Sequence, residues 1–134
     1  MQYRIVHYLL GHETIDKEHT NLLMSLDELR RNALGRFISD DVMRSTAVFL
    51  IDLMKEHFKF EEGLMTEELY PFIDSHKTSH KLVLWYCERM MKHLNAYTIA
   101  DLIDDALQHI DTFDRELVKW LKEHDRIDRR ATKR

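Results

Sequence analysis

Cysteine, proline and glycine are all scarce in this sequence of 134 residues, which contains one, one and three of them respectively. A single cysteine excludes an internal disulfide framework and fits a reducing compartment, so we expect the protein in the cytoplasm. Glycine and proline interrupt helices and mark the turns of strand-rich proteins. Their scarcity therefore predicts long uninterrupted helices and an all-α fold.

Long apolar runs and an excess of basic residues are also missing. The formal net charge is −4, so the sequence offers no basic face for nucleic acid. The apolar runs fall far short of the roughly 18 residues that a membrane-spanning helix needs, and the N-terminus has no signal-peptide pattern. We therefore expect neither a nucleic-acid partner nor a membrane. The length predicts a single domain over residues 1–134, with enough apolar residues (44%) for a core.

Histidine, in contrast, is abundant, and two pairs of metal-capable side chains flank the one proline, Pro71. His57 and Glu61 are four residues apart, and so are His76 and His80. Residues at this spacing share one face of a helix, whereas the residue before a proline disfavours helix. Two antiparallel helices joined at the proline would bring both pairs together. Because histidine is the commonest metal ligand, this stretch predicts half of a buried metal site.

Apolar residues recur at three- and four-residue spacing through four segments, which predicts four helices with one buried face each. The expected elements are an N-terminal arm at 1–13, helices at about 14–33, 39–69, 72–95 and 98–124, and a polar tail at 125–134. Helices of this length joined by short turns predict an up-down-up-down four-helix bundle.

Three further polar residues belong to the first and fourth helices: His19 and His109 interrupt the apolar faces, and Asp114 follows His109. Asp114 follows His109 by five residues and so projects well round a regular helix from it. Both can reach one centre only if Asp114 reaches sideways or the helix is distorted, and a helix bulge here would mark a functional site. The starts of odd helices and the ends of even helices share one end of the bundle. We therefore expect all seven polar residues to converge on one level.

Together these residues resemble the hemerythrin family. The resemblance covers nearly the whole chain, through the segments IDKEHTNLL (15–23), HFKFEEGLM (57–65), YPFIDSHKTSH (70–80) and HIDTFD (109–114). The central motif, HxxxE followed by HxxxH after a Tyr-Pro turn, is specific. Ferritin-like di-iron bundles are the natural rival, but they need two Glu-x-x-His motifs. No histidine in this sequence has a glutamate three residues before it.

The resemblance implies two non-haem iron ions joined by a bridging oxo or hydroxo group. The implied ligands are His19 and His57 for one iron, His76, His80 and His109 for the other, and Glu61 and Asp114 as bridges. By ligand count, the iron with two histidines keeps one open position, which separates a reactive metal site from a structural one. The resemblance further implies that O₂ binds reversibly at that position.

Oxygen binding at an open position needs a dry apolar pocket. The candidate wall residues are Leu22, Leu23, Phe58, Leu102 and Ala106. Ala106 departs from the family, whose members commonly carry a bulky apolar residue three positions before the last histidine. The smaller side chain predicts a roomier pocket that admits water or small anions more easily.

Three functions remain open from the sequence. The first is an O₂ carrier, store or delivery protein, which could pass O₂ to an unidentified protein acceptor. The second is a di-iron enzyme that acts on peroxide, NO or O₂, and the third is an oxygen sensor read by a separate partner. No acid–base residue beyond the ligands is evident near the open position, which weighs against an enzyme. The absence of an appended output domain weighs against a sensor, and seven matched ligands weigh against an inert zinc-bound bundle.

Overall fold

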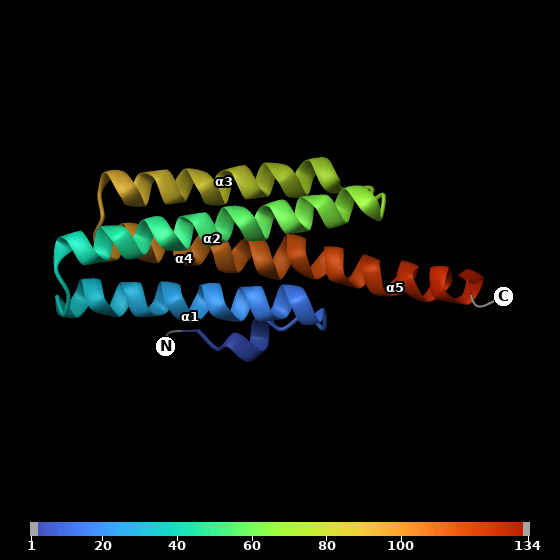
Figure 1. Ribbon diagram of the computed structural model, residues 1–134, viewed down its shortest axis with the longest axis horizontal. Coiled ribbons are helices and arrows are strands. Elements are labelled where there is room, and N and C mark those ends of the chain that lie inside the picture. Colours follow the sequence, from blue (N-terminus) through green and yellow to red (C-terminus); the bar gives the residue numbers. More distant parts are fainter. Residues whose placement is uncertain (1–2, 133–134) are drawn as a thin grey trace.

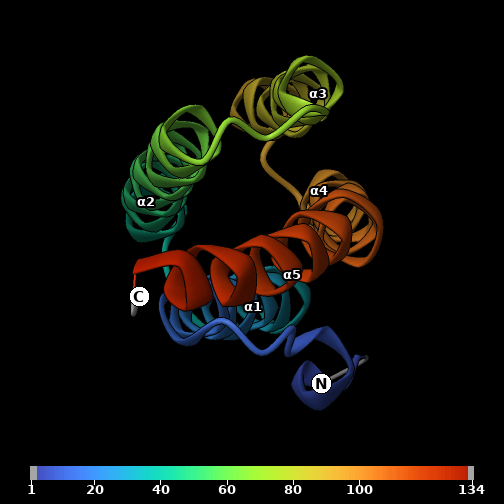
Figure 2. The same cartoon turned by 90° about the vertical axis from the view of Figure 1, so that its right-hand side faces the viewer.

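The computed structural model describes residues 3–132, which form a bundle of helices. Four helices lie side by side, and a fifth follows the fourth and projects beyond the bundle (Figure 1), slanting away from the axis of the fourth (Figure 2). The elements are η1 (Ile5–Tyr8), α1 (Glu13–Gly35), α2 (Asp40–Glu67), α3 (Ile73–Lys92), α4 (Ala96–His109), η2 (Ile110–Asp114) and α5 (Arg115–Thr132). The prediction of an all-α four-helix bundle is confirmed.

Each of the four bundle helices packs against two neighbours. Helix α1 contacts α2 and α4, and α3 contacts the same two helices from the other side (Figure 2). Successive helices run in opposite directions, so the N-terminal ends of α1 and α3 lie at the same end as the C-terminal ends of α2 and α4 (Figure 1). This is the up-down-up-down arrangement that the sequence predicts.

Side-chain caps set the starts of the second and fourth helices. Ser39 accepts a hydrogen bond from the Val42 amide at 3.3 Å, so α2 begins close to the expected residue 39. Helix α4 begins at Ala96, two residues before the expected start at 98. The reason is Asn95, whose side chain accepts from the Thr98 amide at 3.0 Å while the Thr98 hydroxyl accepts from the Asn95 amide. This reciprocal pair satisfies two amides that would otherwise lack partners.

The helix does not end near the expected residue 124: residues 125–132 of the expected polar tail continue α5 to Thr132. Arginine and alanine are good helix formers, and neither glycine nor proline interrupts this stretch. A polar stretch therefore need not mark a helix end. The rest of the predicted tail, 133–134, lies outside the described residues.

The N-terminal arm is fastened to the bundle by polar contacts. The Asp16 carboxylate accepts hydrogen bonds from the amides of Leu10 (2.7 Å) and Gly11 (2.8 Å), and Lys122 donates to the Leu10 carbonyl at 3.0 Å. Gly11 has a φ of 90°, a conformation that glycine adopts without steric cost. The arm thus runs beside α1 (Figure 2).

The largest apolar cluster and the residues of the expected metal site lie at different levels of the bundle. The largest apolar cluster joins residues such as Leu26, Leu50, Met90 and Ile99 from all four helices. Among the residues whose burial is described, ten polar side chains are buried, and seven of them are those of the expected metal site; these seven lie toward the other end of the helices from this cluster. Among the described helices, none is long and apolar enough to cross a membrane.

Candidate metal centre

Helices α2 and α3 place their two polar pairs face to face inside the bundle. His57 and Glu61 are 3% and 0% exposed, and His76 and His80 are each 1% exposed. Glu61 Oε1 lies 2.9 Å from His80 Nε2 and 3.4 Å from His76 Nε2. The turn at the proline therefore brings the four residues together, as their spacing predicts.

The remaining three residues come from α1 and from the junction of α4 and α5. His19 Nε2 lies 2.9 Å from Asp114 Oδ2, and His109 Nε2 lies 3.0 Å from Asp114 Oδ1. The junction is one turn of π-helix, η2, in which the Arg115 amide donates to the Ile110 carbonyl five residues earlier. On a regular α-helix two residues five apart would point about 140° away from each other. The wider π turn brings Asp114 back to the face of His109, so the structure shows one of the two alternatives left open by the sequence, a distorted helix.

The two carboxylates each divide their oxygens between two groups of histidines. Glu61 offers Oε1 to the group of three histidines and Oε2 to His57 (3.2 Å) and His19 (3.7 Å). Asp114 offers Oδ1 to His76 (2.9 Å) and Oδ2 to His19. The result is two adjoining donor sets with both carboxylates in common, whose ligand atoms lie within 4.8 Å of one another in each set. The sets are His19 and His57 with the two carboxylates, and His76, His80 and His109 with the same two.

These donor atoms fit metal cations and lack other partners. The Nε2 atoms of His19, His57, His76 and His109 and three of the four carboxylate oxygens are buried without a hydrogen-bond partner. Lone pairs of nitrogen and oxygen thus face one another across a closed space, which costs free energy unless a cation lies between them. Imidazole and carboxylate ligands together suit iron, zinc or manganese. The side chains present therefore fit a pair of metal ions.

Electrostatics show how strongly the centre attracts positive charge. Burial raises the pKa of Glu61, but the charge of His57 and the nearby imidazoles of His109 and His19 outweigh it and hold that pKa well below its usual range. Burial lowers the pKa of His57, but Glu61 and Glu18 outweigh it and raise that pKa to about 10. Without metal, protons on the imidazoles supply the missing positive charge. Metal binding would displace these protons, because the metal binds neutral imidazole.

Three residues outside the donor sets orient the ligand histidines. Glu18 Oε1 accepts from His57 Nδ1 at 2.7 Å, Glu62 Oε2 accepts from His80 Nδ1 at 2.8 Å, and Ser79 Oγ lies 2.6 Å from His109 Nδ1. A partner on Nδ1 fixes the ring and leaves Nε2 to face the centre. The sequence interpretation missed all three. Each is the direct neighbour of a ligand in the sequence, but it serves a ligand of a different helix or turn, which no spacing rule reveals.

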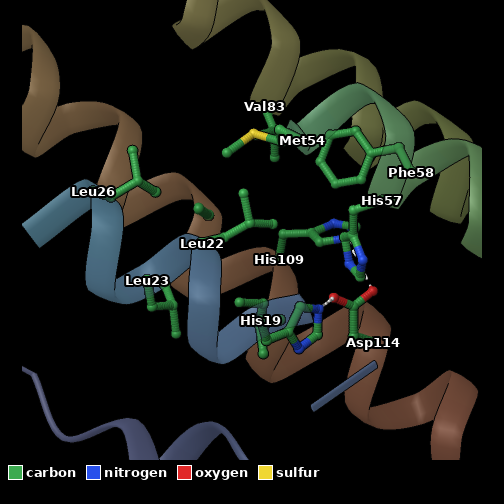
Figure 3. A pocket seen from close by; sticks show the side chains of 12 residues that line it. His19, Leu22, Leu23, Leu26, Met54, His57, Phe58, Val83, His109 and Asp114 are labelled. Carbon is green, nitrogen blue, oxygen red and sulfur yellow. Dashed lines mark ion pairs between the residues drawn. The ribbon is translucent and has the colours of Figure 1, made fainter. Parts of the chain in front are cut away.

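An apolar cavity adjoins the donor set of two histidines (Figure 3). The space open to the centre of a water-sized sphere has a volume of about 20 Å³. This is room for one molecule of the size of water or O₂. The lining residues are His19, Leu22, Leu23, Leu26, Met54, His57, Phe58, Val83, Ala106, His109, Ile110 and Asp114. Apart from the expected ligands, every lining side chain is apolar.

Four of the five expected wall residues line this cavity: Leu22, Leu23, Phe58 and Ala106. Leu102 does not, because it lies one turn before Ala106 on α4 and is buried in the apolar cluster instead. The sequence interpretation missed Leu26, Met54, Val83 and Ile110, shown in part in Figure 3. Their apolar character made them indistinguishable from ordinary core residues.

Comparisons with known proteins agree with this geometry. Residues 10–126 match the family model described as the hemerythrin HHE cation binding domain. The bacteriohemerythrin of Stenotrophomonas maltophilia (strain R551-3) is 28% identical, with 91% of this chain and 72% of the relative covered. The bacteriohemerythrin of Pseudomonas aeruginosa (strain LESB58) is 25% identical, with 88% and 70% covered. No solved structure matches the chain significantly.

Proposed function

This chain belongs to the hemerythrin family, and from that premise we propose that it binds O₂ reversibly at a pair of non-haem iron ions. The observation that carries the proposal is the division of each carboxylate between two groups of histidines. A carboxylate that offers one oxygen to each group is placed to bridge two ions. Five imidazoles and two bridging carboxylates form an unequal pair of donor sets, one with three histidines and one with two.

The unequal donor sets support an open position on one ion only. One iron would have a complete coordination shell of three histidines (His76, His80 and His109), both carboxylates and a bridging oxygen. The other iron, with only His19 and His57 beside the shared ligands, would lack one ligand. When bound, the two ferrous ions supply the electrons that O₂ needs for reversible attachment. The apolar cavity borders His19 and His57, which is the donor set with the open position.

The side chains around the cavity favour a carrier over an enzyme. Leu22, Leu26 and Met54 give the space beside His57 an apolar lining that disfavours water, and a dry pocket slows loss of the ligand by protonation. Among the described residues that line the cavity, the expected ligands are the only ones with ionisable side chains. Catalysis of peroxide or NO turnover would call for a group that gives or takes protons there.

Size limits the ligand to O₂ or another small molecule or anion, since the cavity has room for little more. We place the protein in the cytoplasm, which the single buried thiol of Cys87 supports. A protein acceptor of O₂ belongs to the same proposal, for a carrier must release its ligand somewhere.

Stopped-flow absorption spectroscopy tests this function. The iron-loaded, reduced protein is mixed with O₂ and then purged with inert gas over several cycles. We expect a visible band that forms and disappears reversibly, and we expect His19→Ala to abolish it. His93→Ala, which removes an exposed histidine at the end of α3, serves as the matched control and should cycle normally. Irreversible oxidation on first contact with O₂, with consumption of added peroxide, would favour the enzyme instead.

A further inference from the structure

A surface groove of about 540 Å³ runs between α2 and α3. Its lining residues are Lys55, Phe58, Lys59, Glu62, Gly63, Thr66, Lys77 and Leu84. The N-terminal arm lies beside α1 on the other side of the bundle and leaves this face open (Figure 2). The proposed function makes no use of the groove.

Two of the residues that line the groove contact His80, an expected ligand of the metal centre. Phe58 lines both this groove and the inner cavity, and its ring stacks on His80 with centroids 3.9 Å apart and planes at 14°. Glu62 has a side chain 35% exposed in the groove, and its carboxylate accepts from His80 Nδ1 at 2.8 Å. A molecule seated in the groove would therefore be separated from a ligand histidine by one side chain.

The charge of the groove is opposite to that of the chain. The groove is lined by three lysines, Lys55, Lys59 and Lys77, and by one carboxylate, Glu62. The whole chain, in contrast, carries a net charge of −4. A second groove of about 500 Å³ shares Lys55 and Leu84 with the first and extends it along α2 and α3. Acidic residues also line that extension, and they would repel the phosphate backbone of a nucleic acid. A protein partner with charges of both signs therefore fits the groove better. Lysines of this kind raise the association rate of a negatively charged partner.

We propose that the groove between α2 and α3 is the docking site of a small acidic electron-transfer protein that keeps the iron reduced. This inference rests on the proposed function, because an O₂ carrier whose iron has become ferric no longer binds O₂. Two donor molecules dock in turn and give up one electron each. The two ferric ions each accept one electron, and no bond forms or breaks in the partner.

The contacts of His80 give the electron a short route. A donor cofactor held over Phe58 faces a ring stacked on His80, and the hydrogen bond from His80 to Glu62 is a second connection. Both routes end at His80, which belongs to the donor set of three histidines and does not line the cavity that would hold O₂. Phe58 separates the groove from that cavity.

Binding without electron transfer provides the first test. Oxidised plant-type [2Fe–2S] ferredoxin, an acidic protein, is titrated into the diferric protein at low salt and followed by calorimetry. The double variant Lys55→Glu/Lys59→Glu is compared with Lys17→Glu/Lys119→Glu, which makes the same charge change at exposed lysines of α1 and α5. We expect the dissociation constant of the first pair to rise on the order of tenfold or more, and that of the control pair to change far less.

Reduction kinetics provide the second test. With reduced ferredoxin, the rate for Lys55→Glu/Lys59→Glu should fall on the order of tenfold and the difference should vanish at high salt. Reduction by dithionite should be equal in all variants, since a small reagent needs no docking. Equal losses in both lysine pairs, or no loss in either, would overturn the docking site. The O₂ cycles described above separate the proposals: lysine dependence without O₂ cycling sinks the carrier alone, and O₂ cycling without lysine dependence sinks the docking site alone.

Discussion

Glu61 has a position that no histidine of the centre shares, since its two oxygens face different donor sets. In the proposed di-iron centre, loss of one histidine would weaken one ion, whereas loss of this carboxylate would remove a ligand from both ions and half of the carboxylate charge that faces the five imidazoles. Asp114 is equivalent to Glu61 in this respect. The ligands therefore contribute unequally to metal binding.

Glu61→Ala should consequently lower iron content more than His76→Ala. The measurement is iron per chain by elemental analysis after anaerobic loading and desalting, with circular dichroism to verify the helical fold. Glu68→Ala, which changes an exposed glutamate of the same helix region, should load like the wild type. Equal iron in Glu61→Ala and the wild type would contradict the bridging role.

Ala106 controls the room beside the donor set of two histidines. Replacement by leucine should fill part of the small cavity and exclude water, so the oxygenated form should decay several-fold more slowly in Ala106→Leu than in the wild type. Ala100→Leu makes the same change at a half-buried position of α4 outside the cavity and should leave the decay unchanged. The decay of the visible band in air gives both rates. Equal or slower decay in the wild type than in Ala106→Leu would contradict a role of Ala106 in admitting water to the cavity.

Cys87 should be an unreactive thiol. It is 1% exposed, and burial raises its pKa to about 12. Thiolate is the reactive form, so alkylation by iodoacetamide at pH 8 should be about a thousandfold slower than for a free thiol and should accelerate on unfolding in urea. Because the folded state favours the protonated thiol, the stability that it contributes is complete below about pH 8.5 and falls as pH rises toward 12. Rapid labelling of the folded protein would show that the site opens.

At the scale of elements, the π turn η2 is the part of the fold that the centre needs most. It sets His109 and Asp114 on one face, and the Arg115 amide divides its hydrogen bond between the Ile110 and Thr112 carbonyls. Such a turn is less well bonded than a regular helix, and the bond from Asp114 to metal would hold it in place. Its order should therefore depend on the metal.

Hydrogen exchange measures this dependence. On removal of iron, amide exchange in Ile110–Arg115 should accelerate more than in the middle of α2, at 43–54, where Met43, Leu50 and Met54 pack in the apolar cluster. The comparison uses iron-loaded and chelated samples of the same protein. A uniform change along the chain would mean that the turn is stable by its own packing.

Sequence periodicity predicts helices better than it predicts which face of a helix is buried. The positions of the seven polar residues follow from their spacing and from the alternation of helix direction, so their convergence could be foreseen. On α2, however, Val42, Phe49 and Leu53 also recur at helical spacing, and the structure leaves them 51%, 62% and 38% exposed. Two apolar stripes on one helix look alike in sequence, and only the packing of the neighbouring helices decides between them. The contacts of Glu18, Glu62 and Ser79 are unpredictable for a similar reason, since they depend on how helices lie against one another.

At the scale of the whole molecule, the metals should act as a cross-link among the four bundle helices, because every one of them contributes a ligand. Iron-loaded protein should unfold at a higher Tm than metal-free protein, since folded chain binds the ions and unfolded chain does not. Each 1 kcal/mol shifts Tm by roughly 3–6 °C at this size, so a gain of about 10 °C or more is expected. Calorimetry before and after anaerobic chelation gives the shift, and Fe²⁺ should restore it. In Glu61→Ala the shift should shrink, and an equal Tm with and without iron in the wild type would contradict the cross-link.

The hairpin of α2 and α3 has a consequence during synthesis of the chain on the ribosome. It holds four of the seven donors within residues 57–80, whereas Asp114 is synthesised much later. A nascent chain therefore presents an incomplete chelator to the cell before the remaining donors exist. Any ion captured at that stage would gain His109 and Asp114 as ligands only when the last helix docks.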